Sequence, residues 1–270
     1  MRRRLTTILL LSTLALGVHP SGVSAADVHG DDERDRYVGT GGLLLPGSVD
    51  SGTRSTVAAC AACQWRLATP CLLSPLGHAF DGQSPCMSVV RGCAAGDQLL
   101  RAWFRDAVDP WREIGLVCIG PAGPQTVSDV GRAAAARFEQ DLPVLTPMAQ
   151  PERGVVAQVP VVFGTGQVAG GARYRYPILG TDVDLTAVPR WLWDFGDGAR
   201  LRTDAPGGRF PLTGVTHPYR RAGEYRVGVT TTWTATFMIG DIGPFRVEEP
   251  ITQDRRFTVL VGEGRAVLAP

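Results

Sequence analysis

The sequence contains no lysine, so all 27 of its basic side chains are arginines. Cysteine is confined to residues 60–118, and the C-terminal half has none. After the N-terminus, no apolar run reaches the ~20 residues that a membrane-spanning helix needs. The sequence also lacks a nucleophile elbow, a metal-binding histidine pair and a glycine-rich phosphate loop. These absences argue against a membrane-spanning protein and predict that the protein is not an enzyme.

The N-terminus has the pattern of an export signal. Arg2, Arg3 and Arg4 precede an apolar run over residues 5–17, and small residues follow at 23–26. Residues 1–25 are therefore predicted to be a signal peptide, and the protein to be secreted and extracellular. Without those three arginines, 24 basic residues face 26 acidic ones, a net charge of about −2. We therefore expect no nucleic-acid partner.

Two modules are expected after the signal peptide. Residues 26–59 hold a charge run and few large apolar side chains, which predicts a flexible leader. Residues 60–145 are predicted to form a Cys-rich module, with a hairpin around Asp109-Pro110. A helix is expected over about 127–140, where Thr126 and Asp129 have the spacing of a capping box. A linker and first strand are assigned to residues 146–177.

Six cysteines in an exported chain predict three disulfides. The spacing leaves 15 connectivities open. A short loop favours Cys86 with Cys93, and Cys118 is expected to pair with one of Cys60, Cys63 or Cys71. Cys60-Ala61-Ala62-Cys63 also has the spacing of a redox dithiol or half a zinc site, but the expected sequence context of either is missing. The disulfide candidates are Cys60, Cys63, Cys71, Cys86, Cys93 and Cys118.

A strand, a turn and a second strand are predicted within residues 191–233. Trp191, Trp193 and Phe195 lie on one face of an extended segment, because successive side chains point to opposite faces. Gly196-Asp197-Gly198 then predicts a reversal of the chain. In the second strand, apolar side chains again occupy alternate positions, as in a strand with one face in a core.

Two motifs in this segment resemble those of the PKD (polycystic kidney disease) family of immunoglobulin-like domains. They are the turn Trp193-Asp194-Phe195-Gly196-Asp197-Gly198 and the corner His217-Pro218-Tyr219 followed by Gly223-Glu224-Tyr225. The resemblance implies a β-sandwich over residues 178–262, followed by a tail over 263–270, in a mainly β, actinobacterial-type secreted protein. It implies structural roles for Trp193, Phe195, Gly196, Asp197, Gly198, His217, Tyr219, Gly223 and Tyr225.

Two groups of residues invite a chemical interpretation. Asp182, Asp184, Asp194 and Asp197 offer the oxygen ligands that calcium prefers, although turn aspartates also accept backbone hydrogen bonds. Histidine is a common general acid or base, but the place of His217 in the corner motif favours a structural role. We therefore expect no catalytic residue and no cofactor, with calcium at the four aspartates as the open alternative.

The resemblance implies a secreted structural or interaction module at the cell surface, whose partner is a cell-envelope protein or polysaccharide. The alternative is an accessory, carbohydrate- or protein-targeting part of a secreted hydrolase system. Recognition is expected in the long stretches after Gly198 and after Trp233, because loops of a sandwich usually carry binding. Arginines that could contact an anionic polymer are Arg173, Arg175, Arg200, Arg202, Arg209, Arg220 and Arg221.

Overall fold

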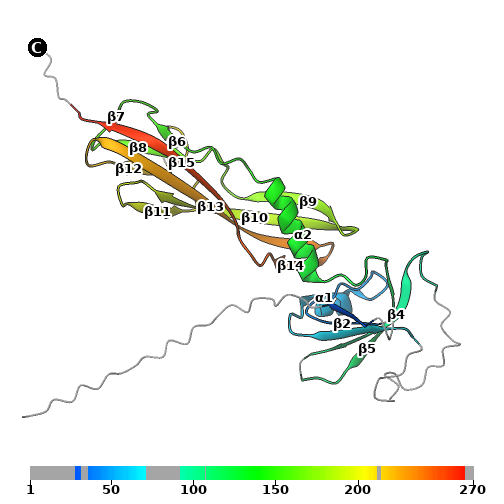
Figure 1. Cartoon of the computed structure of the whole chain (residues 1–270). Helices are drawn as coiled ribbons and strands as arrows, with labels where there is room; N and C mark the ends of the chain where they lie inside the picture. Colours follow the sequence, from blue (N-terminus) through cyan, green and yellow to red (C-terminus); the bar gives the residue numbers. More distant parts are fainter. Residues whose placement is uncertain (1–27, 32–35, 71–91, 107, 212–213, 265–270) are drawn as a thin grey trace, which may run out of the picture.

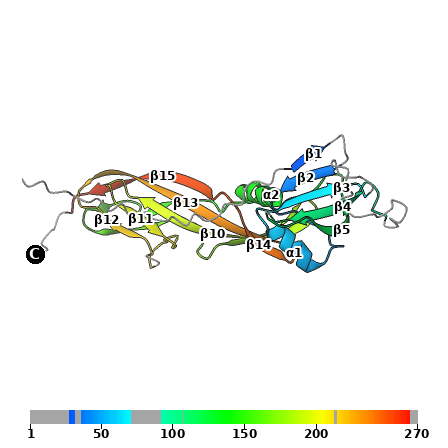
Figure 2. The ribbon, with the colours of Figure 1, turned by 90° about the horizontal axis from the view of Figure 1, so that it is seen from below.

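The computed structural model describes residues 28–31, 36–70, 92–106, 108–211 and 214–264. Within these ranges the protein is mainly β and elongated, with a small N-terminal unit at one end and a long β-structure at the other (Figures 1 and 2). The predicted signal peptide over 1–25 lies outside the described residues. No helix in the described ranges is long and apolar enough to cross a membrane.

The N-terminal unit is an antiparallel meander whose strands pair in sequence order. The predicted hairpin is confirmed as the pairing of its last two strands. A buried cluster that includes Trp65, Leu67 and Leu100 forms its core. The strands are β1 (Val28–Asp31), β2 (Arg36–Thr40), β3 (Gln64–Ala68), β4 (Gln98–Arg105) and β5 (Arg112–Ile119).

The prediction that residues 26–59 form a flexible leader is wrong, because the described part of this stretch belongs to the N-terminal unit. The stretch contributes β1, β2 and the helix α1 (Ser51–Ala59), which Asp50 caps by accepting a 2.8 Å hydrogen bond from the Thr53 N–H. Leu43 and Val57 are almost completely buried in the core of the unit. The few apolar side chains of this stretch are sufficient because β3 and β4 supply the rest of the core.

Helix α2 (Val127–Gln140) begins where the capping box predicts. The Thr126 hydroxyl accepts a 3.1 Å hydrogen bond from the Asp129 N–H, and the Asp129 carboxylate accepts one from the Thr126 N–H. The predicted apolar face, including Val130, Ala134 and Phe138, is buried. However, this face packs on the long β-structure and not on the Cys-rich unit to which we assigned the helix.

Two long antiparallel strands run the length of the β-structure and pair over twelve positions, from Val183 opposite Ile239 to Asp194 opposite Gly228. Shorter strands flank them, so that each long strand has one set of neighbours at one end and another set at the other. The strands of this large sheet are β7 (Val155–Val156), β9 (Ala172–Ile178), β10 (Thr181–Asp194), β11 (Arg200–Thr203), β13 (Gly223–Ile239), β14 (Ile242–Arg246) and β15 (Ile251–Gly262).

At the C-terminal end of β10, a second sheet covers the first and completes a β-sandwich. It comprises β6 (Met148–Gln150), β8 (Pro160–Gly164) and β12 (Thr216–Pro218). The predicted aromatic face is confirmed, since Trp191, Trp193 and Phe195 are at most 2% exposed in the shared core. Residues 146–177, expected to form a linker and one strand, instead contain β6 to β9, and the sandwich core extends from Leu145 to Val261.

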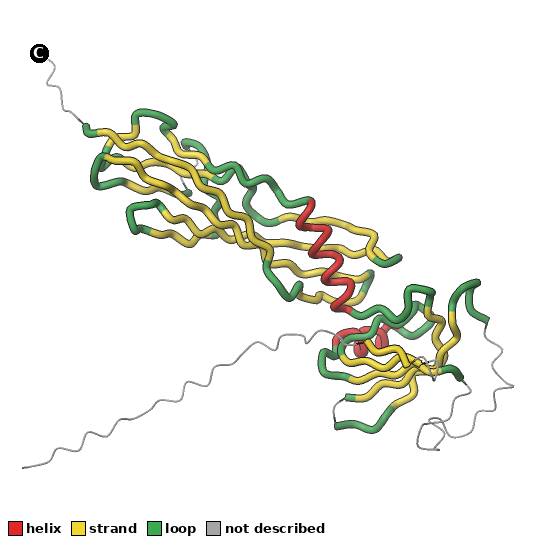
Figure 3. Tube along the Cα trace, viewed as in Figure 1, coloured by secondary structure: helices red, strands yellow, loops and turns green. Residues whose placement is uncertain are grey.

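At the other end, β9 and β14 flank the same two long strands and α2 covers the face that the second sheet leaves open (Figure 3). We call this part the extension. Trp233, Phe237 and Phe138 form its core, with the Phe138 and Trp233 rings 5.6 Å apart. The long stretch after Trp233 contains the β13–β14 hairpin around Gly240, as the β-prone runs on both sides of Gly240 predict.

A buried hydrogen-bond network joins the two cores. The Gln167 side-chain oxygen accepts bonds from the Trp191 indole N–H at 2.8 Å and from the Thr231 hydroxyl at 2.9 Å. Its amide nitrogen donates to the Gln253 oxygen at 2.9 Å and to the Pro143 carbonyl at 2.8 Å. The network therefore fixes β10, β13, β15 and the chain after α2 to one another.

The N-terminal unit contacts the end of the extension that bears β14. Ala58 of α1 belongs to the buried core of the extension, and the Leu44 N–H donates a 2.9 Å hydrogen bond to the Gln125 carbonyl just before α2. Arg54 and Asp241 form an ion pair at 3.7 Å between α1 and the β13–β14 turn. Backbone, apolar and ionic contacts thus all join the two parts.

Replacing Trp193 by Ala is expected to reduce the free energy of unfolding by about 3–5 kcal/mol, because a fully buried large aromatic side chain is deleted. Urea denaturation measures the loss. Leu260→Ala is the control on the exposed face of β15, where the side chain is 69% exposed and the change should stay within about 0.5 kcal/mol. Equal denaturation midpoints for Trp193→Ala and the parent would contradict the assigned sandwich core.

Gln167→Ala is expected to cost at least about 2 kcal/mol, because the Trp191 N–H and the Thr231 hydroxyl lose their acceptor in a buried site. Val168→Ala, at a neighbouring residue that is 66% exposed, is the matched control. Chemical denaturation monitored by tryptophan fluorescence compares the two. If both variants unfolded with the parent, the network would not contribute to stability.

Candidate functional site

The turn between β10 and β11 is closed by its aspartates. The Asp194 carboxylate accepts a 3.1 Å hydrogen bond from the Gly196 N–H, and the Asp197 carboxylate accepts a 3.0 Å bond from the Ala199 N–H. Gly196 has a φ of +80°, and a Cβ there would lie 2.6 Å from the Arg226 carbonyl oxygen. The turn therefore requires glycine at this position both for its backbone conformation and for its close approach to β13.

His217 connects β12 to this turn. Its Nε2 atom lies 2.7 Å from an Asp197 carboxylate oxygen, and its ring stacks on Phe195 with centroids 4.2 Å apart. The Tyr219 hydroxyl donates a 3.1 Å hydrogen bond to the Phe195 carbonyl. The contacts of the His217 side chain are thus those of a corner that holds two sheets together, and they bring no nucleophile to the imidazole.

Opposing effects act on the pKa of Asp197. Partial burial of the carboxyl group would raise its pKa, but the hydrogen bonds from the Ala199 N–H and the His217 ring, together with the charge of His217, outweigh burial and lower it. The carboxylate is therefore the form that the folded corner favours, and its contribution to stability depends on ionisation.

The four candidate calcium ligands do not meet. Asp182 and Asp194 lie at opposite ends of β10, about 40 Å apart at the rise of an extended strand. Asp184 already forms a two-point ion pair with Arg175, at 2.7 and 3.0 Å. A single oxygen cage built from all four aspartates is therefore excluded.

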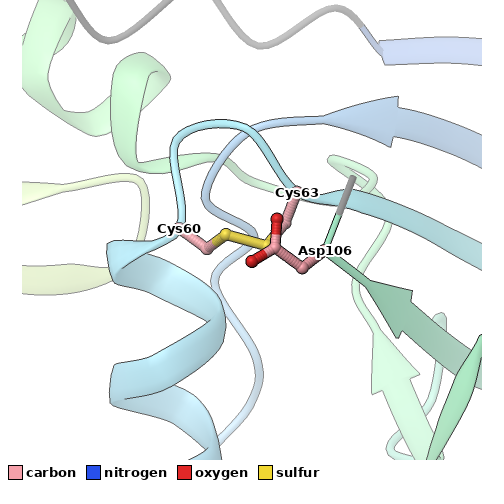
Figure 4. A group of neighbouring side chains, drawn as sticks. All are labelled: Cys60, Cys63 and Asp106. Carbon is pink, nitrogen blue, oxygen red and sulfur yellow. A yellow bond between two sulfur atoms is a disulfide. The ribbon is translucent and has the colours of Figure 1, made fainter. Parts of the chain in front are cut away.

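The N-terminal unit brings two sulfur atoms and one carboxyl group together. Cys60 and Cys63 form a disulfide, and the Asp106 carboxylate at the end of β4 lies beside it (Figure 4). Candidate ligand atoms of the three residues are within 4.8 Å of one another. Since metals bind thiolates, the closed disulfide offers no sulfur ligand of that kind, and Cys60 and Cys63 are joined as the disulfide interpretation of the CxxC spacing predicts.

A second disulfide joins Cys93 to Cys118 and fixes the chain before β4 to the end of β5. This pairing shows that our preferences for Cys86 with Cys93, and for Cys118 with one of Cys60, Cys63 or Cys71, are both wrong. Pairing of β4 with β5 brings the loop before β4 to the end of β5, so sheet topology decides the connectivity and not loop length. Cys71 and Cys86 lie outside the described residues.

The arginines that could contact an anionic polymer are dispersed. Arg173 and Arg175 lie on β9 in the extension, whereas Arg200 and Arg202 lie on β11 beside the sandwich. Arg209 approaches Glu152 at 3.8 Å in a separate loop. Moreover, residues 200–203 pair with β10, so part of the long stretch after Gly198 is strand and not an inserted recognition loop.

The concave sites of the described residues include a larger and a smaller one near the functional candidates. The larger, of about 560 Å³, lies between α1, α2 and the β14 hairpin, with Gly131 and Phe237 among its lining residues. The second, of about 430 Å³, lies on the large sheet of the sandwich, on the face away from the core. We call it the arginine hollow, and its lining residues are Leu192, Asp194, Arg200, Arg226, Gly228, Val229, Thr230, Asp254, Arg255 and Arg256.

Most basic residues of the arginine hollow were missed in the sequence analysis. Only Arg200 was among the arginines considered there, and Arg226, Arg255 and Arg256 were not. The alternation along β13, in which Arg226, Gly228 and Thr230 share the outward face, carries a signal for the site. The signal is incomplete without the register that places β15 beside β13.

The two-layer arrangement with a buried tryptophan and a tyrosine at the corner defines an immunoglobulin-like β-sandwich. Residues 149–235 match the family model of the PKD domain, so the chain contains a PKD domain. The match begins at β6, earlier than our expected boundary of 178, and ends within β13. No curated protein matches the chain. PKD is a non-catalytic family, in keeping with the structural contacts of His217.

Acid is expected to destabilise the corner through Asp197. Because its pKa is lowered in the folded state, its contribution to stability is present above the unfolded-state value of about 3.9 and is lost as pH falls through the folded value. Unfolding free energies measured from about pH 7 to about pH 2.5 should fall less steeply below about pH 4 in Asp197→Asn than in the parent. Parallel curves for the two proteins would contradict this role.

Proposed function

We propose that the protein is secreted and acts as a non-enzymatic binding module at the cell surface, where it holds a cell-envelope polysaccharide or protein. The observation that carries this proposal is the PKD sandwich itself, a member of a family of extracellular, immunoglobulin-like modules. Two disulfides in the N-terminal unit suit an oxidising, extracellular compartment.

The arrangement of the long strands supports a role in display. Because β10 and β13 continue from the extension into the sandwich, the two cores behave as one rigid body on which surface side chains keep fixed positions. The network around Gln167 adds hydrogen bonds at the point where the cores meet. A binding surface on such a body loses little conformational entropy when a ligand is bound.

The proposal for a non-enzymatic role is supported by the chemistry around the most suggestive pair, Asp197 and His217. The Asp197 and His217 side chains are 21% and 14% exposed, and each has a structural partner in the corner. A general base needs access to the proton that it removes, and the described contacts leave this imidazole between Asp197 and two aromatic rings.

Retention on cell envelopes tests the proposed function. Protein comprising residues 26–270 is expected to sediment with envelope material from a producing cell, whereas an unrelated protein of similar size and charge stays in solution. Prior treatment of the envelopes with protease or with glycan-degrading enzymes distinguishes a protein partner from a polysaccharide. Failure of native protein to sediment would contradict the proposal, and so would its release of soluble peptides or sugars from the envelopes.

A further inference from the structure

The arginine hollow lies on the outward face of the sheet that supplies half of the sandwich core. Trp193 and Val229 point inward from β10 and β13, so their neighbours Leu192, Thr230 and Gly228 face the other way. Strands β11, β10, β13 and β15 lie side by side here. The hollow therefore has a floor of paired backbone, which a ligand cannot easily displace.

The register places Gly228 at the centre of the hollow. One row across the four strands contains Arg200, Asp194, Gly228 and Arg256, each directly opposite the next. Arg226 lies two residues before Gly228 on the same face of β13. Charged side chains thus surround a position that has no side chain of its own.

Packing does not explain the glycine at position 228. A Cβ there would meet only the Arg256 Cγ atom, at an ordinary distance of 3.8 Å, and its φ lies outside the left-handed region. Glycine within a strand costs stability, about 0.5–1 kcal/mol relative to alanine, and commonly marks a place where a ligand approaches the backbone. The missing side chain keeps the floor of the hollow open.

Two arginines of the hollow are available to a ligand. Asp194 is held by Arg200 at 3.0 Å and by the Gly196 N–H, and Asp254 accepts a hydrogen bond from the Thr230 hydroxyl. Arg226 and Arg256 have no ion pair among the described residues and are exposed. Arg255 lies opposite the inward-facing Val229, so the outward face of the lining carries three arginines and two aspartates, a formal charge of +1.

We infer that the arginine hollow binds an anionic glycan, through bidentate hydrogen bonds from Arg226 and Arg256 to carboxylate or phosphodiester oxygens. The planar guanidinium group matches both kinds of oxyanion. This inference rests on the proposed function and assigns to it a site and a class of ligand. Gly228 admits the polymer close to the sheet.

The lining argues against two other classes of ligand, single-stranded nucleic acid and a protein surface. It contains no aromatic side chain, whereas proteins that bind single-stranded nucleic acid stack bases on aromatic rings. Its apolar residues are only Leu192 and Val229, too few for the desolvated anchors of a protein interface. A polar, charged polymer chain with no apolar anchor fits this composition best.

Binding of purified polymers by the full mature protein tests the inference directly. Polygalacturonate carries carboxylates, poly(glycerol phosphate) carries phosphodiesters, and dextran is the neutral control. Binding to at least one charged polymer is expected in titration calorimetry, with weaker affinity as ionic strength rises from about 0.05 to about 0.5 M. Which polymer binds identifies the oxyanion, and no binding to either would overturn the inference.

Three variants separate the site from general charge. Arg226→Gln should weaken binding about tenfold or more, as expected for the loss of charge-assisted hydrogen bonds. Gly228→Thr should weaken it similarly without changing net charge, because the new side chain fills the floor, while the unfolding midpoint stays the same or rises. Arg173→Gln removes an exposed arginine of β9 in the extension and should bind like the parent.

Specific outcomes would overturn the inference while leaving the proposed function intact. One is undiminished polymer binding by both Arg226→Gln and Gly228→Thr. Another is an equal loss in Arg173→Gln, which would indicate general charge attraction. A third is equally tight binding of a single-stranded oligonucleotide of matched charge. In each case, envelope sedimentation of the same variants reports separately whether the protein still acts as an envelope-binding module.

Discussion

The continuous pairing of β10 with β13 is the constraint on which the rest of the structure depends. Twelve consecutive residue pairs hold these strands together, while their neighbours change from β9 and β14 to β11 and β15 along the way. One sheet must therefore be buried by two different partners, α2 at one end and the three-stranded sheet at the other. The polar Gln167 network lies between these apolar cores, where a purely apolar contact would leave the indole N–H of Trp191 unsatisfied.

This constraint also explains why family resemblance describes only part of the chain. The PKD match covers residues 149–235 and includes the small sheet, β10 and most of β13. Helix α2 and β14 lie outside the matched range, although α2 buries the half of the sheet that includes Trp233 and Phe237. The extension is thus a local addition to the sandwich that shares its longest strands, and it gives the N-terminal unit a surface to contact.

Sequence patterns within short segments correctly predicted the features that depend on local interactions. Alternation identified the inward face of Trp191, Trp193 and Phe195, and the Thr126 and Asp129 spacing identified the start of α2. Features that depend on distant pairing were beyond such patterns: the partner of Cys118, the merging of a supposed linker into four strands, and the separation of Asp182 from Asp194. Each of these follows from which strands pair, and no short window of sequence contains that information.

The arginine hollow also depends on both a local pattern, the alternation along β13, and a distant one, the pairing with β15. Alternation along β13 places Val227 and Val229 in the core and, by the same geometry, places Arg226 and Gly228 on the outside. The inward residues make the strand rigid because they are buried, and that rigidity fixes the outward residues. The register with β15 then adds Arg256 opposite Gly228. Folding and ligand binding therefore use opposite faces of one strand, so a change at Gly228 can alter binding without altering the core.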